Sequence, residues 1–355
     1  METESMFMNV AASNATRLDE KLARIRAGRY QRSDFIIADA KDADMGSGVT
    51  TAGPRRGPGG AVAGWKSRQD YLDGIAAVIA QDIVDIMLVS VSNLERLQDA
   101  GLFRASKIKP AIRANDATDC WGGVRGGSYA QPASRPFRTA VLSRVMYGTP
   151  HAFADLPVSG TDLGLYSITF NNDLDADMLS LEAFSAFRRD AAEVGFKYFM
   201  EVFNPNAPRG LDAADAPSFL NDALLRSLAG VSKHDRPEFL KIPFNGRRAL
   251  EELVNYDASL VVGVLGGGAG TTRDAFELVF QAERSGARLA LFGRKINLAD
   301  SPTALIFFMR QVADGTLTPK DAVAAYHAEL VKAGIRASRS LDDDQQITET
   351  PLQQS

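Results

Sequence analysis

The chain has 355 residues, of which 45% are hydrophobic and 24% charged, and 40 basic against 44 acidic side chains give a net charge of −4. This mixture is typical of a globular protein with one large core or two smaller ones. It lacks the basic stripe of a nucleic-acid-binding protein, so we expect no nucleic-acid partner. The sequence contains no run of about eighteen apolar residues, which is the length that would predict a membrane helix. The start Met-Glu-Thr-Glu-Ser lacks the charged and apolar regions of a signal peptide, so we expect a cytoplasmic protein without membrane contact.

The chain contains one cysteine, Cys120, and three scattered histidines. A single cysteine excludes an intramolecular disulfide, and the histidines show no metal-ligand spacing. We therefore predict no metal and no cofactor. Cys120 could act as a nucleophile only with a histidine base nearby, and we interpret it as a bystander.

The two ends of the chain differ in composition from the rest. Residues 1–14 are small and polar and predict a flexible N-terminus. Leu18, Leu22 and Ile25 then recur at helical spacing, which predicts an amphipathic N-terminal helix that closes the bottom of the domain. Residues 337–355 are polar again, and we expect this C-terminal tail to be disordered or to reach a partner subunit.

The first predicted strand, residues 35–38, runs directly into a charged segment that begins with Asp39 and Lys41. Charges at the end of a buried strand are costly unless they have a function, so we count both residues as candidates for the site. A solvated acidic turn is the alternative. The following residues 48–64 are rich in Gly, Pro and Arg and are too long for a simple connection, which predicts an elaborated loop.

Further along the chain, polar residues follow the predicted strands at 107–114, 164–170 and 197–203. Arg113 lies at the end of the first of these, and Asn204 follows the last, so both are candidate substrate-binding residues by position. Glu201 lies inside the last strand. Because burial favours the protonated form of a carboxylate, we predict that it acts as a general acid or base. A structural ion pair with Lys241 is the alternative for Glu201.

The sixth predicted strand, residues 239–242, carries Lys241 among apolar neighbours. Desolvation penalises the ammonium, and an uncharged amine can attack a carbonyl group. The next strand ends in a glycine cluster that includes Gly267 and Gly268, followed by the start of a helix with a hydroxyl cap. Such a turn lets backbone N–H groups approach an anion, although a simple tight turn is the alternative.

The last predicted strand, residues 288–292, ends in Gly293 and Arg294. A cation beside a glycine can bind a phosphate, although Arg294 could also be a solvated surface charge. An imine-forming lysine next to two anion sites suggests a small phosphorylated carbonyl compound as the substrate.

Eight predicted strands, near residues 35, 84, 108, 165, 198, 239, 260 and 288, alternate with helical patterns. This alternation predicts an α/β fold, a single (βα)8 barrel over residues 15–336 with long loops on the catalytic face. A doubly wound open sheet is the alternative, but it would place a phosphate loop after the first strand, whereas the glycine-rich turns come late.

A lysine ending one strand, Gly-Gly ending the next and Gly-Arg ending the last resemble the archaeal-type class I fructose-bisphosphate aldolases and the related deoxyribose-phosphate aldolases. The resemblance covers the last third of the barrel. It implies a Schiff base on Lys241 and phosphate contacts from Gly267, Gly268, Gly293 and Arg294. It also implies an aspartate from strand one in the active site, for which Asp39 is the best match.

The family carries a proton-transferring tyrosine just before a Pro-Arg-Gly turn. Pro208, Arg209 and Gly210 could match that turn, but no tyrosine precedes them here. We therefore assign proton transfer to Glu201 or Asp39.

Together these features predict a class I aldolase-like lyase that cleaves or forms a C–C bond through a lysine Schiff base, and a homo-oligomer of unspecified size. Two alternatives remain open: a phosphosugar isomerase or hydrolase barrel without an imine, and a noncatalytic metabolite-binding barrel.

Overall fold

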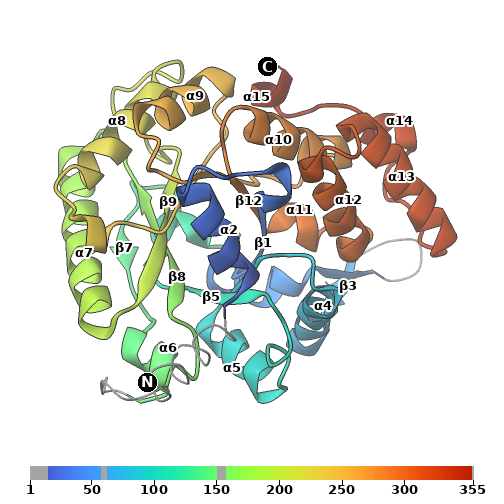
Figure 1. The fold of residues 1–355 in the computed structure, drawn as a ribbon, viewed down its shortest axis with the longest axis horizontal. Coiled ribbons are helices and arrows are strands. Elements are labelled where there is room, and N and C mark those ends of the chain that lie inside the picture. Colours follow the sequence, from blue (N-terminus) through green and yellow to red (C-terminus); the bar gives the residue numbers. More distant parts are fainter. Residues whose placement is uncertain (1–14, 57–61, 150–156, 354–355) are drawn as a thin grey trace, which may run out of the picture.

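The computed structural model describes residues 15–56, 62–149 and 157–353, and eight parallel strands within them close into a barrel (Figure 1). Neighbouring strands follow the order β1-β12-β11-β10-β9-β8-β5-β4. The predicted (βα)8 architecture is confirmed, and each predicted strand has its counterpart. The barrel strands are β1 (Ile36–Lys41), β4 (Ile86–Val89), β5 (Lys109–Arg113), β8 (Leu163–Thr169), β9 (Lys197–Phe203), β10 (Leu240–Ile242), β11 (Val262–Leu265) and β12 (Leu289–Phe292).

Helices follow the strands and surround the barrel, as a parallel sheet with crossover connections requires. Hydroxyl or carboxylate side chains cap several of them, for example Ser67, Asp173 and Thr271. The helices of the outer ring are α4 (Arg68–Gln81), α5 (Val91–Asp99), α7 (Leu174–Val194), α8 (Ala216–Leu228), α9 (Arg247–Tyr256), α10 (Thr272–Arg284), α12 (Pro302–Asp314) and α13 (Pro319–Lys332).

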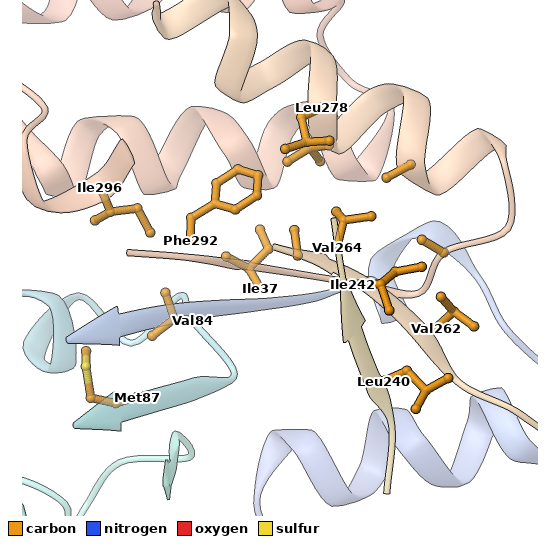
Figure 2. Packing of buried hydrophobic residues seen from close by; sticks show 14 of the residues in the cluster. Ile37, Val84, Met87, Leu240, Ile242, Val262, Val264, Leu278, Phe292 and Ile296 are labelled. Atoms are coloured by element: carbon orange, nitrogen blue, oxygen red, sulfur yellow. The ribbon is translucent and has the colours of Figure 1, made fainter. Parts of the chain in front are cut away.

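Two apolar layers result because successive side chains of a strand point to opposite faces. The outer layer packs strands against helices, and Figure 2 shows members of it such as Ile37, Met87, Ile242 and Phe292. The inner layer fills the barrel and is smaller. It contains Leu18, Leu22, Ile36, Ala38, Ala40, Ile86, Leu88, Ala111, Leu163, Leu165, Phe199, Phe239, Val261, Leu289 and Leu291.

Helix α2 (Arg17–Arg26) confirms the predicted N-terminal helix. Leu18 and Leu22 are buried in the inner layer. Arg17 binds backbone oxygens just before β4, so the helix closes the barrel at the amino ends of the strands. The opposite, carboxyl ends of the strands are therefore the open face where (βα)8 enzymes carry their active sites.

Several short elements cover this open face. After β1 come α3 (Asp44–Ser47), the 3-10 turn η2 (Gly48–Ala52) and an antiparallel hairpin of β2 (Pro54–Arg56) and β3 (Val62–Trp65). After β5 come the short strand β6 (Asp116–Ala117), the 3-10 turn η4 (Thr118–Gly123), its antiparallel partner β7 (Pro136–Phe137) and helix α6 (Leu142–Tyr147). The predicted long loops on the catalytic face thus have defined structure over their described residues.

The C-terminal tail differs from the expectation of a disordered or partner-reaching segment. It forms α14 (Leu341–Asp344) and α15 (Thr350–Gln353) and lies against α10 and α13 of the same barrel (Figure 1). Leu352 is 2% exposed and belongs to the outer core. One buried apolar side chain and several hydrogen bonds over long sequence separations hold this polar segment in place.

The predicted flexible N-terminus, residues 1–14, lies outside the described residues. Among the residues that are described, no helix is long and apolar enough to cross a membrane.

Candidate active site

The register of three neighbouring strands brings Lys241, Glu201 and Ser167 to one level of the barrel. Lys241 on β10 is the direct partner of Glu201 on β9, and Glu201 is the direct partner of Ser167 on β8. Phe239 and Phe199, two residues earlier on their strands, both lie in the inner layer. Because side chains alternate with a period of two, Lys241 and Glu201 also point into the barrel.

Lys241 and Glu201 form a buried ion pair. Lys241 Nζ lies 2.5 Å from Glu201 Oε1, and the two side chains are 7% and 3% exposed. On the other side of Lys241 its strand partner is Gly263, where a Cβ atom would lie 2.2 Å from Cγ of Leu289. Glycine at this position therefore lets Leu289 fill the barrel beside the lysine.

Arg113 connects this pair to a second carboxylate. Its guanidinium donates to Glu201 Oε2 at 3.3 Å and, through Nε, to Asp42 Oδ2 at 2.6 Å. Burial alone would raise the pKa of Asp42, but the positive charges of Arg113 and Lys241 outweigh that effect and lower it. The result is a network of two cations and two carboxylates at the mouth of the barrel.

Neutral groups complete the surroundings of Arg113. Its NH1 group donates to Ser167 Oγ at 2.7 Å and lies 3.7 Å from Cys120 Sγ. The side chain of Asn115 accepts from the amide of Ser167 at 2.7 Å and so fixes that part of β8. Burial raises the pKa of Cys120 to about 12, so the sulfur stays a thiol near neutral pH, which agrees with its interpretation as a bystander.

The structure does not bring Asp39 to this network, contrary to our expectation. The partners of Asp39 on β12 and β4 are Phe292 and Met87, both in the outer layer, so its side chain points toward the helices. Lys41, two residues later, shares this face, and its Nζ lies 3.4 Å from Asp39 Oδ1 and 3.3 Å from Asn297 Oδ1. Asp42, the next residue along, reaches the barrel mouth instead.

Asp39 is fully buried, and neither of its carboxylate oxygens accepts a hydrogen bond from a described residue. Desolvation raises its pKa to about 6, although the neighbouring charge of Lys41 opposes the shift. Burial also lowers the pKa of Lys41. Asp39 and Lys41 therefore form a buried pair on the helix-facing side of the barrel wall, and a contact of Lys41 with substrate stays a prediction.

Asn204 lies at the exposed rim, directly after β9. Its side-chain amide exchanges two hydrogen bonds with that of Asn245, of 3.0 and 2.8 Å, and Asn245 follows β10. The pair joins the loops that follow the strands of Glu201 and Lys241. Its amides are exposed enough to meet a ligand, and its contact with substrate stays a prediction.

The two late glycine turns follow β11 and β12, the strands next to β10. Within the described chain, the backbone amides of Gly267 and Gly268 donate to no other group, and a Cβ atom at either position would meet nothing within 4 Å. Gly267 has a positive φ of 64°, which favours glycine. Arg294, after Gly293, is exposed and forms no ion pair with a described residue.

The N-terminus of α10 is already occupied by carboxylates of this chain. Asp274 accepts from the amide of Thr271 at 2.9 Å, and Asp344 of the C-terminal tail accepts from the amide of Thr272 at 2.8 Å. These bonds use the amides of Thr271 and Thr272, whereas the amides of residues 267–270 in the preceding turn, Gly267 and Gly268 among them, donate to no described group.

Asp42 and Ser167 belong to the network although the sequence analysis did not single them out. The segment from Ile36 to Lys41 is apolar on both faces until Asp39, so no alternation told which aspartate faces inward. Ser167 offers no charge and no motif. Its place at the level of Glu201 follows from strand register alone.

No group of three or more His, Cys, Asp or Glu side chains in the described part of the chain is arranged to hold a metal ion. Fold and side chains together define a (βα)8 barrel whose mouth carries a buried lysine–glutamate pair, an arginine–aspartate pair and two glycine-containing turns.

Solved structures of similar fold include archaeal fructose 1,6-bisphosphate aldolases. An archaeal fructose 1,6-bisphosphate aldolase matches 84% of this chain and 99% of its own length, with a TM-score of 0.57 and 14% identity. A second archaeal aldolase structure, with its catalytic lysine bound to the carbinolamine intermediate of the substrate, matches 84% of this chain and 98% of its own, with a TM-score of 0.55 and 16% identity.

A protein from Corynebacterium glutamicum matches 80% of this chain and 86% of its own, with a TM-score of 0.55 and 18% identity. The chain matches no protein-family model and no curated protein sequence. At these identities the likeness establishes the fold, and it agrees with the resemblance to class I aldolases that the late strands predict.

Proposed function

We propose that the protein is a class I aldolase-like lyase that forms or cleaves a C–C bond in a small phosphorylated carbonyl compound through an imine on Lys241. The observation that carries this proposal is the buried Lys241 amine, held inside the barrel mouth 2.5 Å from Glu201 Oε1. Geometry of this kind supplies a base at the nitrogen that must lose a proton before it can attack a carbonyl carbon.

Glu201 is the proton carrier in this scheme. It accepts a proton from the lysine ammonium, and the free amine adds to the carbonyl carbon while one of its own protons moves to the carbonyl oxygen, which gives a carbinolamine. Glu201 returns its proton to the carbinolamine hydroxyl, which leaves as water, and an iminium remains. Glu201, again a carboxylate, then takes the proton of the β-hydroxyl while the iminium accepts the electron pair of the bond between its α- and β-carbons. This bond breaks to give an enamine and an aldehyde or, in the reverse direction, forms.

Arg113 and Asp42 orient the base. Arg113 donates to Glu201 Oε2, which leaves Oε1 directed at Lys241, and Asp42 in turn holds Arg113 through its Nε. This arrangement keeps the carboxylate in place while the lysine changes its charge and its covalent state.

The substrate phosphate is assigned to the glycine turns after β11 and β12. The amides of Gly267 and Gly268 and the guanidinium of Arg294, which have no acceptor among the described residues, can donate charge-assisted hydrogen bonds to it. Gly293 lets the backbone come close to β1, since a Cβ atom there would lie 2.9 Å from the carbonyl oxygen of Ala40.

One observation favours the alternative without an imine. The 2.5 Å ion pair between Lys241 and Glu201 is also the geometry of a lysine that stays protonated and acts as an electrostatic clamp, as in a phosphosugar isomerase or hydrolase. A metabolite-binding barrel would keep the same network without turnover.

Borohydride treatment in the presence of dihydroxyacetone phosphate separates these functions, because only an imine is reduced to a stable adduct. We expect irreversible, ligand-dependent mass gain in the wild type and none in Lys241→Ala, whereas Lys197→Ala, which alters an exposed lysine at the other end of β9, should behave as wild type. A screen of phosphorylated ketoses and aldoses for cleavage then tests turnover. Mass gain that is equal in the wild type and Lys241→Ala would refute the proposal.

A further inference from the structure

The C-terminal strap, residues 340–353, crosses from α13 to the start of α10 and continues along that helix to Gln281. His327 on α13 contacts Asp344 at 2.9 Å, and Gln281 on α10 donates to the carbonyl oxygen of Leu352 at 2.9 Å. Leu352 itself is buried in the outer core. The strap is therefore fixed at both ends, and hydrogen bonds join the residues between them to the start of α10.

Between these fixed points, the strap binds the polar start of α10. Thr348 donates to Asp274 through both its amide, at 2.8 Å, and its hydroxyl, at 2.5 Å, and the amide of Glu349 adds a further bond to the same carboxylate at 3.2 Å. Burial alone would raise the pKa of Asp274, but these bonds and those from Thr271 outweigh that effect and lower it. Asp274 therefore accepts the hydrogen bonds of the strap as a charged carboxylate.

Glu349 reaches past α10 to the turn after β12. Its Oε1 lies 2.6 Å from Nζ of Lys295, whose side chain is 1% exposed, while that of Glu349 is 28% exposed. The same ammonium lies 3.5 Å from the carbonyl oxygen of Ala269 in the turn after β11. Lys295 therefore joins the two glycine turns, and Glu349 is its ion-pair partner.

Gly270, in the turn after β11, lies directly against the ion pair of Lys295 and Glu349. A Cβ atom there would lie 2.7 Å from an oxygen of Asp274 and 3.1 Å from both Glu349 Oε1 and Lys295 Nζ. The turn after β11 thus approaches the ion pair so closely that a side chain at residue 270 would displace it.

We propose that Glu349 is a positioning residue of the phosphate site. By neutralising the buried Lys295, it holds the turn of Gly267 and Gly268 and the turn of Gly293 and Arg294 in the mutual arrangement that binds a phosphate group. This inference rests on the phosphate site of the proposed function. It makes the C-terminal strap a structural part of that site.

The physical reason is the cost of an unpaired buried charge. Without Glu349, the ammonium of Lys295 keeps one weak contact to a carbonyl oxygen, and desolvation favours movement of its helix, α11 (Arg294–Asn297), toward solvent. Arg294 lies next to Lys295 in the chain, so such a movement displaces the guanidinium and separates the two turns.

Titration calorimetry of the full-length protein with inorganic phosphate tests the proposal. We expect Glu349→Ala to weaken phosphate binding by about tenfold or more and Glu349→Gln, which keeps a hydrogen bond from Lys295, to weaken it less. The matched control is Glu329→Ala, which removes an exposed ion pair with Lys332 on α13 and should bind phosphate as the wild type does.

A double-mutant cycle shows whether Glu349 acts through Lys295. If it does, the double variant Lys295→Ala/Glu349→Ala binds phosphate as Lys295→Ala alone does. This comparison does not use the single Glu349 variant, so it remains valid should that variant fold poorly. The proposal would be overturned if Glu349→Ala and Lys295→Ala both fold and their losses of phosphate-binding free energy add in the double variant. It would also be overturned if Glu349→Ala binds phosphate as the wild type does.

The experiments distinguish an incorrect role of Glu349 from an incorrect lyase function. Phosphate titration needs no imine, so a wild type that binds phosphate but gives no adduct on Lys241 refutes the lyase, while weaker phosphate binding by Glu349→Ala still supports the role of Glu349. A wild type that binds no phosphate overturns the role of Glu349, whatever Lys241 does.

Discussion

Glu201 Oε1 lies 2.5 Å from Lys241 Nζ, and the two residues are direct neighbours in the register of β9 and β10. Backbone hydrogen bonds of the barrel, rather than a flexible loop, therefore set the distance between base and nucleophile. A site carried by strands is held more precisely than one carried by loops.

Replacing Glu201 by Gln should slow turnover and imine formation while the fold is kept. The amide has nearly the same size but cannot accept the lysine proton, and loss of a general base costs roughly 10²- to 10⁴-fold in rate. Steady-state rates and the rate of borohydride-dependent mass gain provide the measurement, with Glu329→Gln as the surface control. Activity within a factor of two of wild type would remove Glu201 from the mechanism.

Replacing Arg113 by Met should destabilise the fold strongly. The variant leaves Asp42 and Glu201 as buried carboxylates without their arginine, and removal of one partner from a buried pair costs about 3–5 kcal/mol. Urea unfolding measures the loss. The double variant Arg113→Met with Asp42→Asn should recover part of it, and strict additivity of the two changes would show that Asp42 and Arg113 are not coupled.

The stability of wild type relative to Asp39→Asn should depend on pH. Burial raises the pKa of Asp39 from 3.8 to about 6, so the folded protein binds this proton more tightly than the unfolded chain does. The wild type is therefore penalised as the pH rises from the unfolded to the folded pKa, and the Asn variant, which has no such proton, is not.

Between about pH 4.5 and 7.5 we expect the variant to gain about 2 kcal/mol relative to wild type, on top of a constant offset from the loss of the partner of Lys41. Urea unfolding at both pH values measures this change. A difference between the two proteins that does not vary with pH would mean that Asp39 is charged throughout.

Replacing Gly263 by Ala should destabilise the barrel. The added methyl group would lie 2.2 Å from Cγ of Leu289, and overpacking of a barrel interior costs about 1–3 kcal/mol. Gly230→Ala is the matched control, because a Cβ atom there meets nothing within 4 Å and φ is not positive. Thermal unfolding should show rescue by Leu289→Ala, and a Gly263→Ala protein as stable as the control would contradict the packing.

The barrel could be predicted from the sequence because its strands are short apolar runs separated by helical patterns, and the N-terminal helix because Leu18, Leu22 and Ile25 keep strict helical spacing. Lys241 and Glu201 were predicted as candidates because a charge inside a buried strand requires a partner. Which face of a strand such a charge takes depends on register. The residues of β1 before Asp39 are apolar on both faces, so the sequence does not show whether Asp39 or Asp42 faces into the barrel.

The C-terminal strap could not be predicted for a different reason. Its polar composition indicated disorder, yet Thr348 and Glu349 bind groups 74 and 54 residues away in the chain. Hydrogen bonds over such separations leave no periodic pattern in the sequence. The apolar contacts of this tail with the outer core, from the buried Leu352 and the partly buried Ile347 and Ala337, are too few to indicate packing.

Site-resolved mass spectrometry of the protein after borohydride reduction with dihydroxyacetone phosphate tests the imine most directly. The account predicts that the reduced three-carbon phosphate adduct lies on the peptide that contains Lys241 and that other lysine-containing peptides, including those of Lys41 and Lys295, remain unmodified. An adduct located on another lysine, or no adduct at any lysine at saturating ligand, would contradict it.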